Sequence, residues 1–315
     1  MPGVGSRAPS GRRLADALET LAARLWPAPL HRFTGWLLLL PALLLVGLLV
    51  AGLVYVADFS LRELDPDTYR LSESYSLANY AEVGRRTVYL RIMARSLLAA
   101  LVVTLVVLVL GFPYAYAMVR TGSPWLRKLL LIGLFLPFFI GQVVRAYGWL
   151  IVLGNQGLIN QLLGALGLGP FKLLYHYPAV LLGLAQYMLP FAVLLLAPAI
   201  VAIDEEVELA SESLGASWPL TFWHVVLPMA RPGLVGAGVV VFTITLTDYA
   251  LPDILGGGTN DFVANAIYDA FFQISDAGLG SALAVILVLV GSTIVAALFA
   301  LLGAGTMSFL RERSG

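Results

Sequence analysis

The sequence of 315 residues contains no cysteine, and only 12% of its residues are charged. Without cysteine the chain has no disulfide bond, no thiol nucleophile and no sulfur-ligated metal. Its three histidines, His31, His176 and His224, lie far apart, and neither an HExxH nor a GxSxG motif occurs. The phosphate-binding motif GxxxxGKS/T is also absent. We therefore expect no catalytic, cofactor-binding or metal-binding residue in this chain.

The chain is instead rich in apolar sequence. Hydrophobic residues make up 59% of it and its mean hydropathy is +0.88, whereas roughly 25% of the residues of an average soluble domain are charged. A helix needs about 20 apolar residues to cross a bilayer, and the runs here are too long for barrel strands. We predict an all-α integral membrane protein with six transmembrane helices, at about 36–56, 96–119, 129–153, 178–203, 232–250 and 281–302.

Lysine and arginine are distributed unevenly between these spans. If the N-terminus is inside, the leader 1–35, the two inner loops and the tail 304–315 carry 11 of the 19 basic residues. The outer segments hold seven, and six of those lie in the long loop 57–95 beside six acids. Basic residues favour the inner side, and long loops weigh less in this rule. We therefore predict that both ends of the chain and the connection 204–231 face the cytoplasm.

The connection 204–231 is acidic and amphipathic, unlike the apolar runs on either side. The acids of Asp204–Glu206 lie where a first helical turn would place them against the positive end of the helix dipole. Gly215 can adopt the left-handed conformation that ends such a helix. Ser217, followed by Trp-Pro, indicates a second helix, which we expect to stop near Pro228. Its apolar side would consist of Trp218, Phe222, Val225 and Val226.

Two amphipathic helices between membrane spans can lie on the bilayer, pack on the protein's own surface, or receive a partner. The spacing here resembles the signature loop of the binding-protein-dependent permeases of ABC importers. That signature is Glu-Ala-Ala, three residues, Gly, nine residues, Ile, one residue and Leu-Pro, and the resemblance implies that the loop docks the ATPase subunit. Gly215, Val225, Leu227 and Pro228 match this spacing, and Ala210 takes the first alanine position.

The match departs from the signature at its acidic end. Leu209 stands at the glutamate position and Ser211 at the second alanine position, with Glu208 and Glu212 beside them. We take Glu208 as the nearest substitute for the family's glutamate. The docking residues that the resemblance implies are Glu208, Ala210, Glu212, Gly215, Phe222, Val225, Leu227 and Pro228.

The resemblance extends along the chain from Asn79 to about Leu302, where the order of features is similar to the polyamine (spermidine/putrescine) branch of the type I, MetI-like permeases. The matching segments are NYAEV, GFPYAYAMVR, LPFFIGQVVRAYGWLIVLGNQGLIN, YMLPFAVLLLAPAI and DYALPDILGGG. The resemblance implies a permease domain over 36–303 in the bacterial inner membrane. It also implies four kinds of partner: a related second permease, two ATPase subunits that use ATP, an extracytoplasmic solute-binding protein and the lipid bilayer. The formal net charge of zero gives no indication of a nucleic-acid partner.

Two ionisable residues fall at predicted membrane depth, where a charge costs about 2.5–3.5 kcal/mol on insertion scales and usually faces a cavity or a partner. Arg145 lies in the third span near Trp149, and Asp248 ends the fifth span beside Tyr249. A carboxylate and aromatic faces attract ammonium groups, so these four residues are candidates for the substrate pathway of an organic cation. The alternative is that Asp248 only caps its span and that Arg145 extends toward the interface.

Three other functions are alternatives to a polyamine permease, and the sequence supports them less well. The first is an ABC permease for another small solute, such as an amino acid or an organic or inorganic ion. The second is an ion-coupled secondary transporter that uses Asp248 and Arg145, which would be supported by an inverted repeat, and the sequence shows no convincing one. The third is an intramembrane enzyme, which would need clustered His, Asp or Ser residues.

Overall fold

The computed structural model describes residues 34–311, and the chain divides after Tyr55 into two units. The described part of the first unit is the larger part of helix α2 (Thr34–Ser60). From Leu39 to Tyr55 every residue of this apolar helix is exposed, which suits a surface that faces lipid. The predicted leader 1–35 lies outside the described residues except for its last two.

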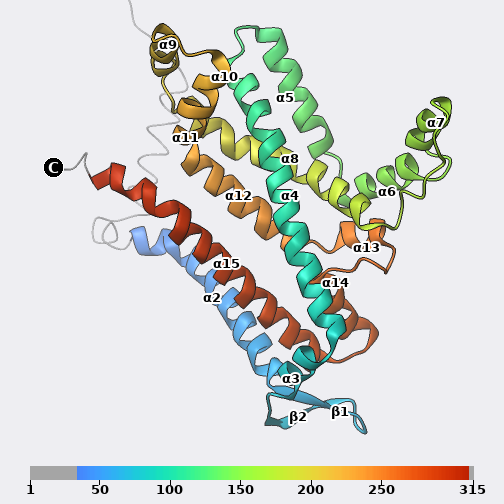
Figure 1. Ribbon diagram of the computed structural model, residues 1–315. Helices are drawn as coiled ribbons and strands as arrows, with labels where there is room; N and C mark the ends of the chain where they lie inside the picture. The colour runs from blue at the N-terminus through green and yellow to red at the C-terminus, as the bar shows by residue number, and fades with distance from the viewer. Residues whose placement is uncertain (1–33, 312–315) are drawn as a thin grey trace, which may run out of the picture. The chain divides into compact units, whose positions relative to one another are not determined.

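The second unit, from Val56 onward, contains one antiparallel hairpin and is otherwise helical (Figure 1). The hairpin and the helices that follow it are β1 (Arg62–Asp65), β2 (Arg70–Tyr75), α3 (Ala78–Arg85), α4 (Thr87–Arg120), α5 (Pro124–Phe138), α6 (Gln142–Leu153), α7 (Leu158–Ala165) and α8 (Tyr177–Val201). The connection 204–231 contains α9 (Glu205–Ser213), α10 (Trp218–Thr221), the π-helical turn η2 (Phe222–Val226) and α11 (Leu227–Met229). The remaining elements are α12 (Arg231–Leu246), α13 (Ala250–Gly256), α14 (Val263–Tyr268), the π-helical turn η3 (Asp269–Gln273) and α15 (Ala277–Arg311).

Four of the described helices, α2, α4, α8 and α15, are long and apolar enough to cross a membrane. Two bent pairs of helices pass the same test if each pair is counted as one span. These pairs are Pro124–Phe138 with Gln142–Ala165, bent by 98°, and Trp218–Met229 with Arg231–Leu246, bent by 69°. By length and composition the described chain therefore offers four to six spans, and the count of six stays a prediction.

The sharp bend between α5 and α6 has a local cause. Pro137 lies in the last turn of α5, and Gly141 is the N-cap of α6. The last carbonyl groups of a helix have no N–H partner within it. The guanidinium of Arg145 in α6 donates to the carbonyls of Pro137 and Ile140, the latter at 2.9 Å. The third span predicted over 129–153 is thus interrupted rather than one straight helix.

The hydrophobic core of the second unit lies where α4, α8 and α12 pack against one another (Figure 1). Val103 and Val107 of α4, Leu184 and Met188 of α8 and Val241 of α12 are each at most 1% exposed. Helices in lipid gain no hydrophobic free energy from meeting one another, so their association depends on close packing. These three helices therefore form the frame on which the surrounding segments are placed.

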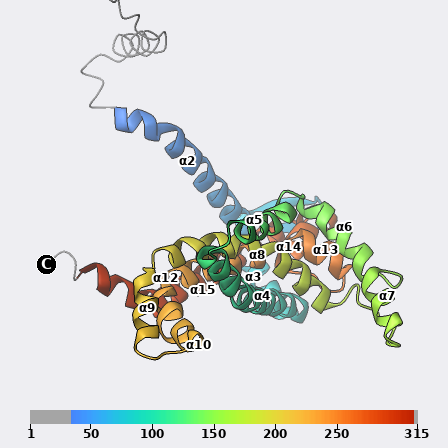
Figure 2. The ribbon, with the colours of Figure 1, turned by 90° about the horizontal axis from the view of Figure 1, so that it is seen from above.

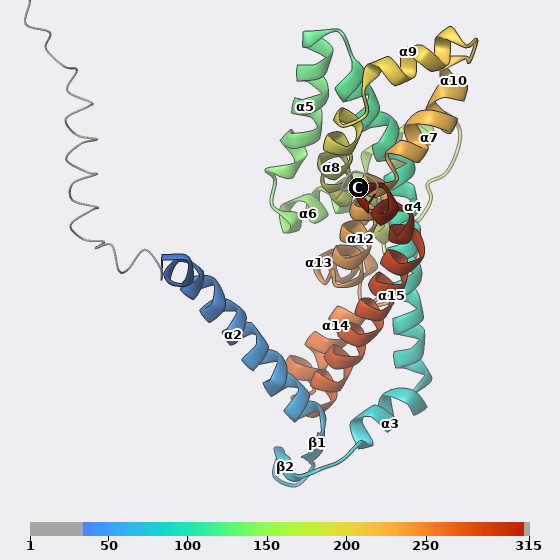
Figure 3. The ribbon, with the colours of Figure 1, turned by 90° about the vertical axis from the view of Figure 1, so that its left-hand side faces the viewer.

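The segments with functional interest lie at different places on this frame. In Figure 3, α9 and α10 lie near one end of α4, whereas α3 and the hairpin lie near the other end. Seen from above in Figure 2, α6 and α7 lie away from α9 and α10. The hairpin is fixed by Asn79, whose amide donates to the carbonyls of Ser60 at 3.1 Å and Arg62 at 2.8 Å.

The contact between α8 and α12 supplies a test of this packing. A Cβ added at Gly233 would lie 2.3 Å from the Cβ of Ala199, whereas one added at Gly236 meets nothing within 4 Å. We expect Gly233→Ala to separate the helices and to lower stability by about 1–3 kcal/mol, as overpacking usually does. Gly236→Ala should not destabilise, because alanine favours helix. The melting temperatures of the two purified variants in detergent test this expectation. Equal melting temperatures would contradict the close approach of α8 and α12.

Candidate functional site

The first helix of the connection 204–231 forms as its sequence predicts. Asp204 is the N-cap of α9, and its carboxylate accepts a hydrogen bond from the N–H of Glu206. The first turn of α9 is acidic, which suits the positive end of the helix dipole. Gly215 follows with φ of +91°, a left-handed conformation that glycine adopts without strain. The predicted helix end at Gly215 is confirmed.

The second helical segment starts where predicted and ends close to the predicted position. Ser217 is the N-cap of α10, and helical geometry runs through η2 and α11 to Met229. In η2 the N–H of Leu227 bonds back to the carbonyl of Phe222, a π-helical pattern. The segment ends at Met229, one residue after Pro228, so the end predicted near Pro228 is confirmed.

The two helices of the connection are joined by one side-chain hydrogen bond. The hydroxyls of Ser211 in α9 and Thr221 in α10 lie 3.0 Å apart, and Thr221 is 2% exposed. Ser211 occupies the second alanine position of the signature. The departure from the signature thus supplies a polar tie that alanine could not make.

One face of α4 lies against the second helical segment. Phe112 and Tyr116 are one helical turn apart on α4. Their rings each lie 5.4 Å from the ring of Phe222, and the ring of Tyr116 lies 5.9 Å from that of Trp218. Trp218 in turn stacks on Phe222 at 5.4 Å. Edge-to-face pairs of this kind contribute about 0.5–1.5 kcal/mol beyond the area they bury, so the aromatic cluster holds α10 and η2 to α4.

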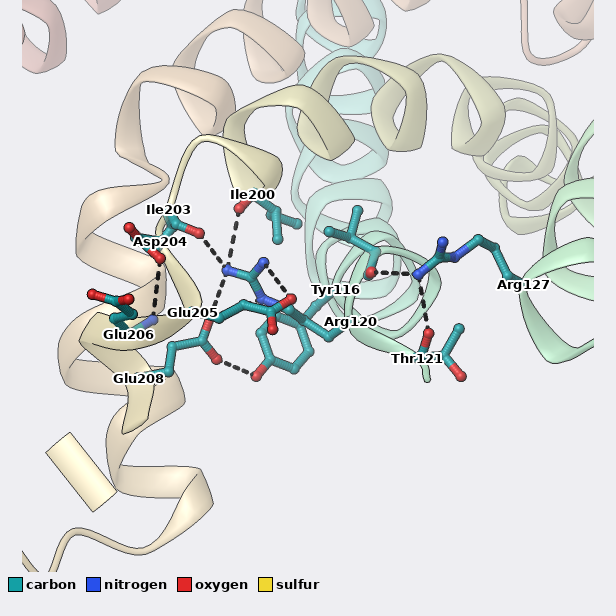
Figure 4. Close-up of polar contacts among 11 residues, drawn as sticks. Tyr116, Arg120, Thr121, Arg127, Ile200, Ile203, Asp204, Glu205, Glu206 and Glu208 are labelled. Carbon is teal, nitrogen blue, oxygen red and sulfur yellow. Dashed lines mark hydrogen bonds and ion pairs between the residues drawn. The ribbon is translucent and has the colours of Figure 1, made fainter. Parts of the chain in front are cut away.

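Arg120, the last residue of α4, joins three segments (Figure 4). Its guanidinium donates to the carbonyls of Ile203 at 2.6 Å and Ile200 at 3.4 Å, at the end of α8. The same group pairs with Glu208 of α9, with Nε–Oε1 at 2.9 Å and Nη2–Oε1 at 2.7 Å. A longer contact of 3.5 Å joins Nη1 to the carboxylate of Glu205. One side chain therefore connects α4, α8 and α9.

The ion pair between Arg120 and Glu208 is mostly shielded from solvent. The two side chains are 14% and 12% exposed, and the hydroxyl of Tyr116 donates to the second oxygen of Glu208 at 2.6 Å. Removing one partner of a buried pair typically costs about 3–5 kcal/mol, because the other charge is left without compensation. Glu208 thus points into its own chain, while Leu209, at the glutamate position of the signature, is 60% exposed.

The outer side of the connection is apolar with acids beside it. Its four most exposed apolar residues apart from Trp218 are Leu209, Leu214, Leu220 and Trp223, at 60%, 90%, 51% and 62% exposure, and Val207 and Met229 are exposed as well. Glu205, Glu206 and Glu212 are exposed as well. Of the candidate docking residues, Ala210, Glu212 and Gly215 are exposed, whereas Phe222, Val225, Leu227 and Pro228 are half-buried against the rest of the chain. We call Leu209, Leu214, Leu220 and Trp223 the outer apolar face.

A second polar cluster lies where α12 ends. Asp248 is 7% exposed, and its carboxylate accepts a hydrogen bond from the amide of Gln142 in α6 at 2.5 Å. The other carboxylate oxygen accepts the N–H of Leu251 at 3.0 Å, so Asp248 also caps the start of α13. Within residues 34–311 no Lys or Arg forms an ion pair with Asp248. This buried carboxyl therefore has only uncharged partners within the described chain.

The other three candidates of the pathway lie around this cluster without forming one site. Arg145 is 9% exposed, and its guanidinium is engaged at the bend after α5 and lies over the ring of Tyr187 at 5.1 Å. The indole N–H of Trp149 lies 3.4 Å from the amide oxygen of Gln186 in α8. Tyr249, next to Asp248, turns its ring toward the ring of Tyr268 at 4.9 Å.

Sequence reasoning missed Arg120, Tyr116 and Gln142 as site residues. Arg120 and Glu208 are 88 residues apart, and no local pattern pairs them. A usable signal did exist, because Phe112, Tyr116 and Arg120 recur at helical spacing at the end of one apolar run. Gln142 stands one turn before Arg145, and its uncharged side chain gave no sign of a contact with Asp248.

Comparison with known proteins places these features in a family. Residues 107–307 match the family described as the binding-protein-dependent transport system inner membrane component. The chain is 31% identical over 261 residues to the spermidine/putrescine transport system permease protein PotB of Escherichia coli strain K12, which covers 81% of this chain and 90% of that protein. It is 33% identical over 155 residues to the molybdenum transport system permease protein ModB of Azotobacter vinelandii, covering 49% of this chain and 67% of that protein.

The fold is shared with solved ABC transporters at low sequence identity. One is the crystal structure of a bacterial alginate ABC transporter in complex with an alginate pentasaccharide-bound periplasmic protein, with a TM-score of 0.68 at 19% identity over 87% of this chain and 96% of that chain. Another is an inward-facing conformation of the MetNI methionine ABC transporter, with a TM-score of 0.53 at 19% identity over 68% of this chain and 94% of that chain. With its apolar helices, the chain is a multi-pass protein of the bacterial inner membrane. It belongs to the family of binding-protein-dependent inner membrane components and is a permease subunit of an ABC importer, not an enzyme.

Proposed function

We propose that the connection 204–231 is the cytoplasmic site at which this permease docks a separate ATPase subunit. The observation that carries the proposal is the outer apolar face, in which Leu214 is 90% and Trp223 is 62% exposed. Large apolar side chains that gather on an exposed surface rimmed by polar residues mark interaction sites. The neighbouring acids disfavour burial of this face in lipid. The proposal requires both ends of the chain to be cytoplasmic, as the distribution of Lys and Arg predicts.

We further propose that two ATPase subunits, a related second permease and an extracytoplasmic solute-binding protein complete the transporter. Membership of the family supports the ATPase and the binding protein, and the alginate transporter of similar fold was crystallised with a periplasmic protein bound. This chain lacks a phosphate-binding GxxxxGKS/T motif, which fits a division of labour in which the ATPase uses the ATP.

We propose that the solute is a polyamine or a similar small organic cation. The support is the similarity to the spermidine/putrescine permease PotB over 81% of this chain. The buried carboxyl of Asp248, without a cationic partner among the described residues, is a group to which a passing ammonium would be attracted. Beside it the rings of Tyr249, Tyr268 and Phe272 form a row with centroids 4.9 Å and 4.8 Å apart. We assign the pathway first to Asp248 and Tyr249, and Arg145 and Trp149 remain candidates at separate positions.

A second candidate is another small solute, including an inorganic ion. The similarity to the molybdenum permease ModB favours it, at 33% identity. That similarity covers only 49% of this chain, which is why the polyamine stands first. An oxyanion would be repelled by Asp248, so the two candidates predict opposite effects of neutralising this residue.

Gly215 tests the docking site. At φ of +91° a β-branched side chain is strained, so Gly215→Val should distort the end of α9, abolish uptake and weaken co-purification of the ATPase while the chain still inserts. Gly122→Val is the matched control, because Gly122 is exposed, has nothing within 4 Å of an added Cβ, and lies in the α4–α5 connection. Leu214→Ser removes the most exposed apolar side chain without backbone strain and should weaken co-purification too. Normal ATPase binding by Gly215→Val and Leu214→Ser would refute the docking site.

Asp248 tests the solute. Asp248→Asn keeps the size of the side chain and removes its charge, and hydrogen bonds to charged groups contribute about 1.5–3 kcal/mol. Since 1.4 kcal/mol corresponds to a factor of ten, uptake of radiolabelled spermidine or putrescine should fall by about tenfold or more. Assembly with the ATPase should be unchanged. Asp253→Asn is the matched control, because Asp253 is exposed five residues farther along. Equal uptake by the two variants would remove Asp248 from the pathway.

A further inference from the structure

The loop 204–231 is bonded covalently to α8 and α12, and side chains of α4 hold it as well. Three side chains on one face of α4 contact it: Phe112 packs on Phe222, Tyr116 reaches both helical segments, and Arg120 reaches α9. Between the loop and α12 the chain bends by 69°. The second segment is therefore not a straight extension of α12. A displacement of the loop would not be transmitted along one continuous straight helix into α12.

The contacts of Arg120 also restrict motion of the loop relative to α8, at the linker that joins α8 to α9. The chain leaves α8 at Val201 and enters α9 at Glu205, so only a short linker separates these helices. Arg120 donates to the carbonyls of Ile200 and Ile203 on one side of the linker and pairs with Glu208 beyond it. The linker cannot pivot without breaking one of these bonds.

We propose that Arg120 is a positioning residue that couples the docking loop to α4, so that α9, α4 and the end of α8 move as one rigid body. The proposal rests on the proposed function, because coupling has a meaning only if an ATPase acts on the loop. It assigns to α4 the task of carrying the motion of the loop across the membrane. Rigid-body motion of packed helices is a standard form of such transitions, whereas a loop pivoting on its two covalent ends would leave α4 in place.

The first experiment compares Arg120→Gln with Arg127→Gln in the complete transporter. Arg127 is the matched control, because it lies near the same end of α4 and donates to two carbonyls, of Val119 at 3.2 Å and Thr121 at 3.1 Å, without touching α9 (Figure 4). Three quantities are measured: co-purification of the ATPase, ATP hydrolysis, and uptake of radiolabelled spermidine and putrescine.

Arg120→Gln should keep the ATPase bound, because the outer apolar face is unchanged. Its uptake per ATP hydrolysed should fall at least about fivefold, the lower end of coupling between sites in proteins. Arg127→Gln should match the wild type. If the uptake per ATP hydrolysed by Arg120→Gln is within twofold of that by Arg127→Gln, the proposal is overturned. If the wild type takes up neither probe, the polyamine assignment fails, and the variants are compared by ATP hydrolysis stimulated by the binding protein with its retained solute.

The second experiment replaces the polar contacts of Tyr116 and Arg120 with Glu208 by a covalent link between α4 and α9. It covers the case in which Arg120→Gln does not assemble. The chain has no cysteine, so Tyr116→Cys with Glu208→Cys places two unique thiols on α4 and α9. A short bifunctional maleimide joins them. Before linking, the double variant should be uncoupled like Arg120→Gln, and linking should restore uptake per ATP to within about twofold of the wild type. Uptake that stops, or stays low, after linking would show that α9 must move relative to α4 and would contradict the proposal.

The two experiments separate this inference from the docking site. If Gly215→Val and Leu214→Ser leave the ATPase bound, the loop is not the docking site. If those variants lose the ATPase while Arg120→Gln keeps both the ATPase and normal uptake per ATP, the docking site stands. The proposal that Arg120 couples the loop to α4 is then refuted.

Discussion

Arg120 joins the end of α4, the end of α8 and the start of α9, and the placement of α9 in the loop 204–231 depends on that guanidinium. It satisfies carbonyls that α8 leaves without helical partners and at the same time pairs with Glu208 in a mostly shielded site. The aromatic rings of Phe112 and Tyr116 extend the same face of α4 to the second helical segment. Together with Val226 and Ala230, which are buried in the core, these contacts fix the position of the loop and of its outer apolar face.

The same physical solution recurs at the bend between α5 and α6. There Arg145 turns its guanidinium onto the carbonyls of Pro137 and Ile140. In a chain surrounded by lipid, a carbonyl freed at a helix end has no water to bond, so a donor within the protein is needed. An arginine supplies several donors in a fixed planar arrangement and suits this task better than lysine. Both arginines thus allow the chain to turn sharply, and Arg120 also fixes α9, a helix of the proposed docking site.

The sequence predicted what depends on local chemistry. Asp204 as a cap, the acidic first turn of α9 and the helix end at Gly215 each follow from a single residue type at a defined place. The membership of the permease family was also predicted, because the glycine-to-Leu-Pro spacing of the loop is a long and specific pattern. The pairing of Arg120 with Glu208 was not predicted, since it depends on how α4 packs against α8. The π-helical turn just before Pro228 was not predicted either.

The account depends on the loop and α4 moving together, and structures of the assembled transporter in two states test this most directly. Electron cryomicroscopy of the complex, nucleotide-free and trapped with a non-hydrolysable ATP analogue, would show the pair of Arg120 and Glu208 in both. The account predicts that the ATPase covers Leu214 and Trp223 in both states and that α9 keeps its place against α4 while the two change orientation in the membrane. A pair that opens in one state, with α9 displaced along a stationary α4, would contradict it.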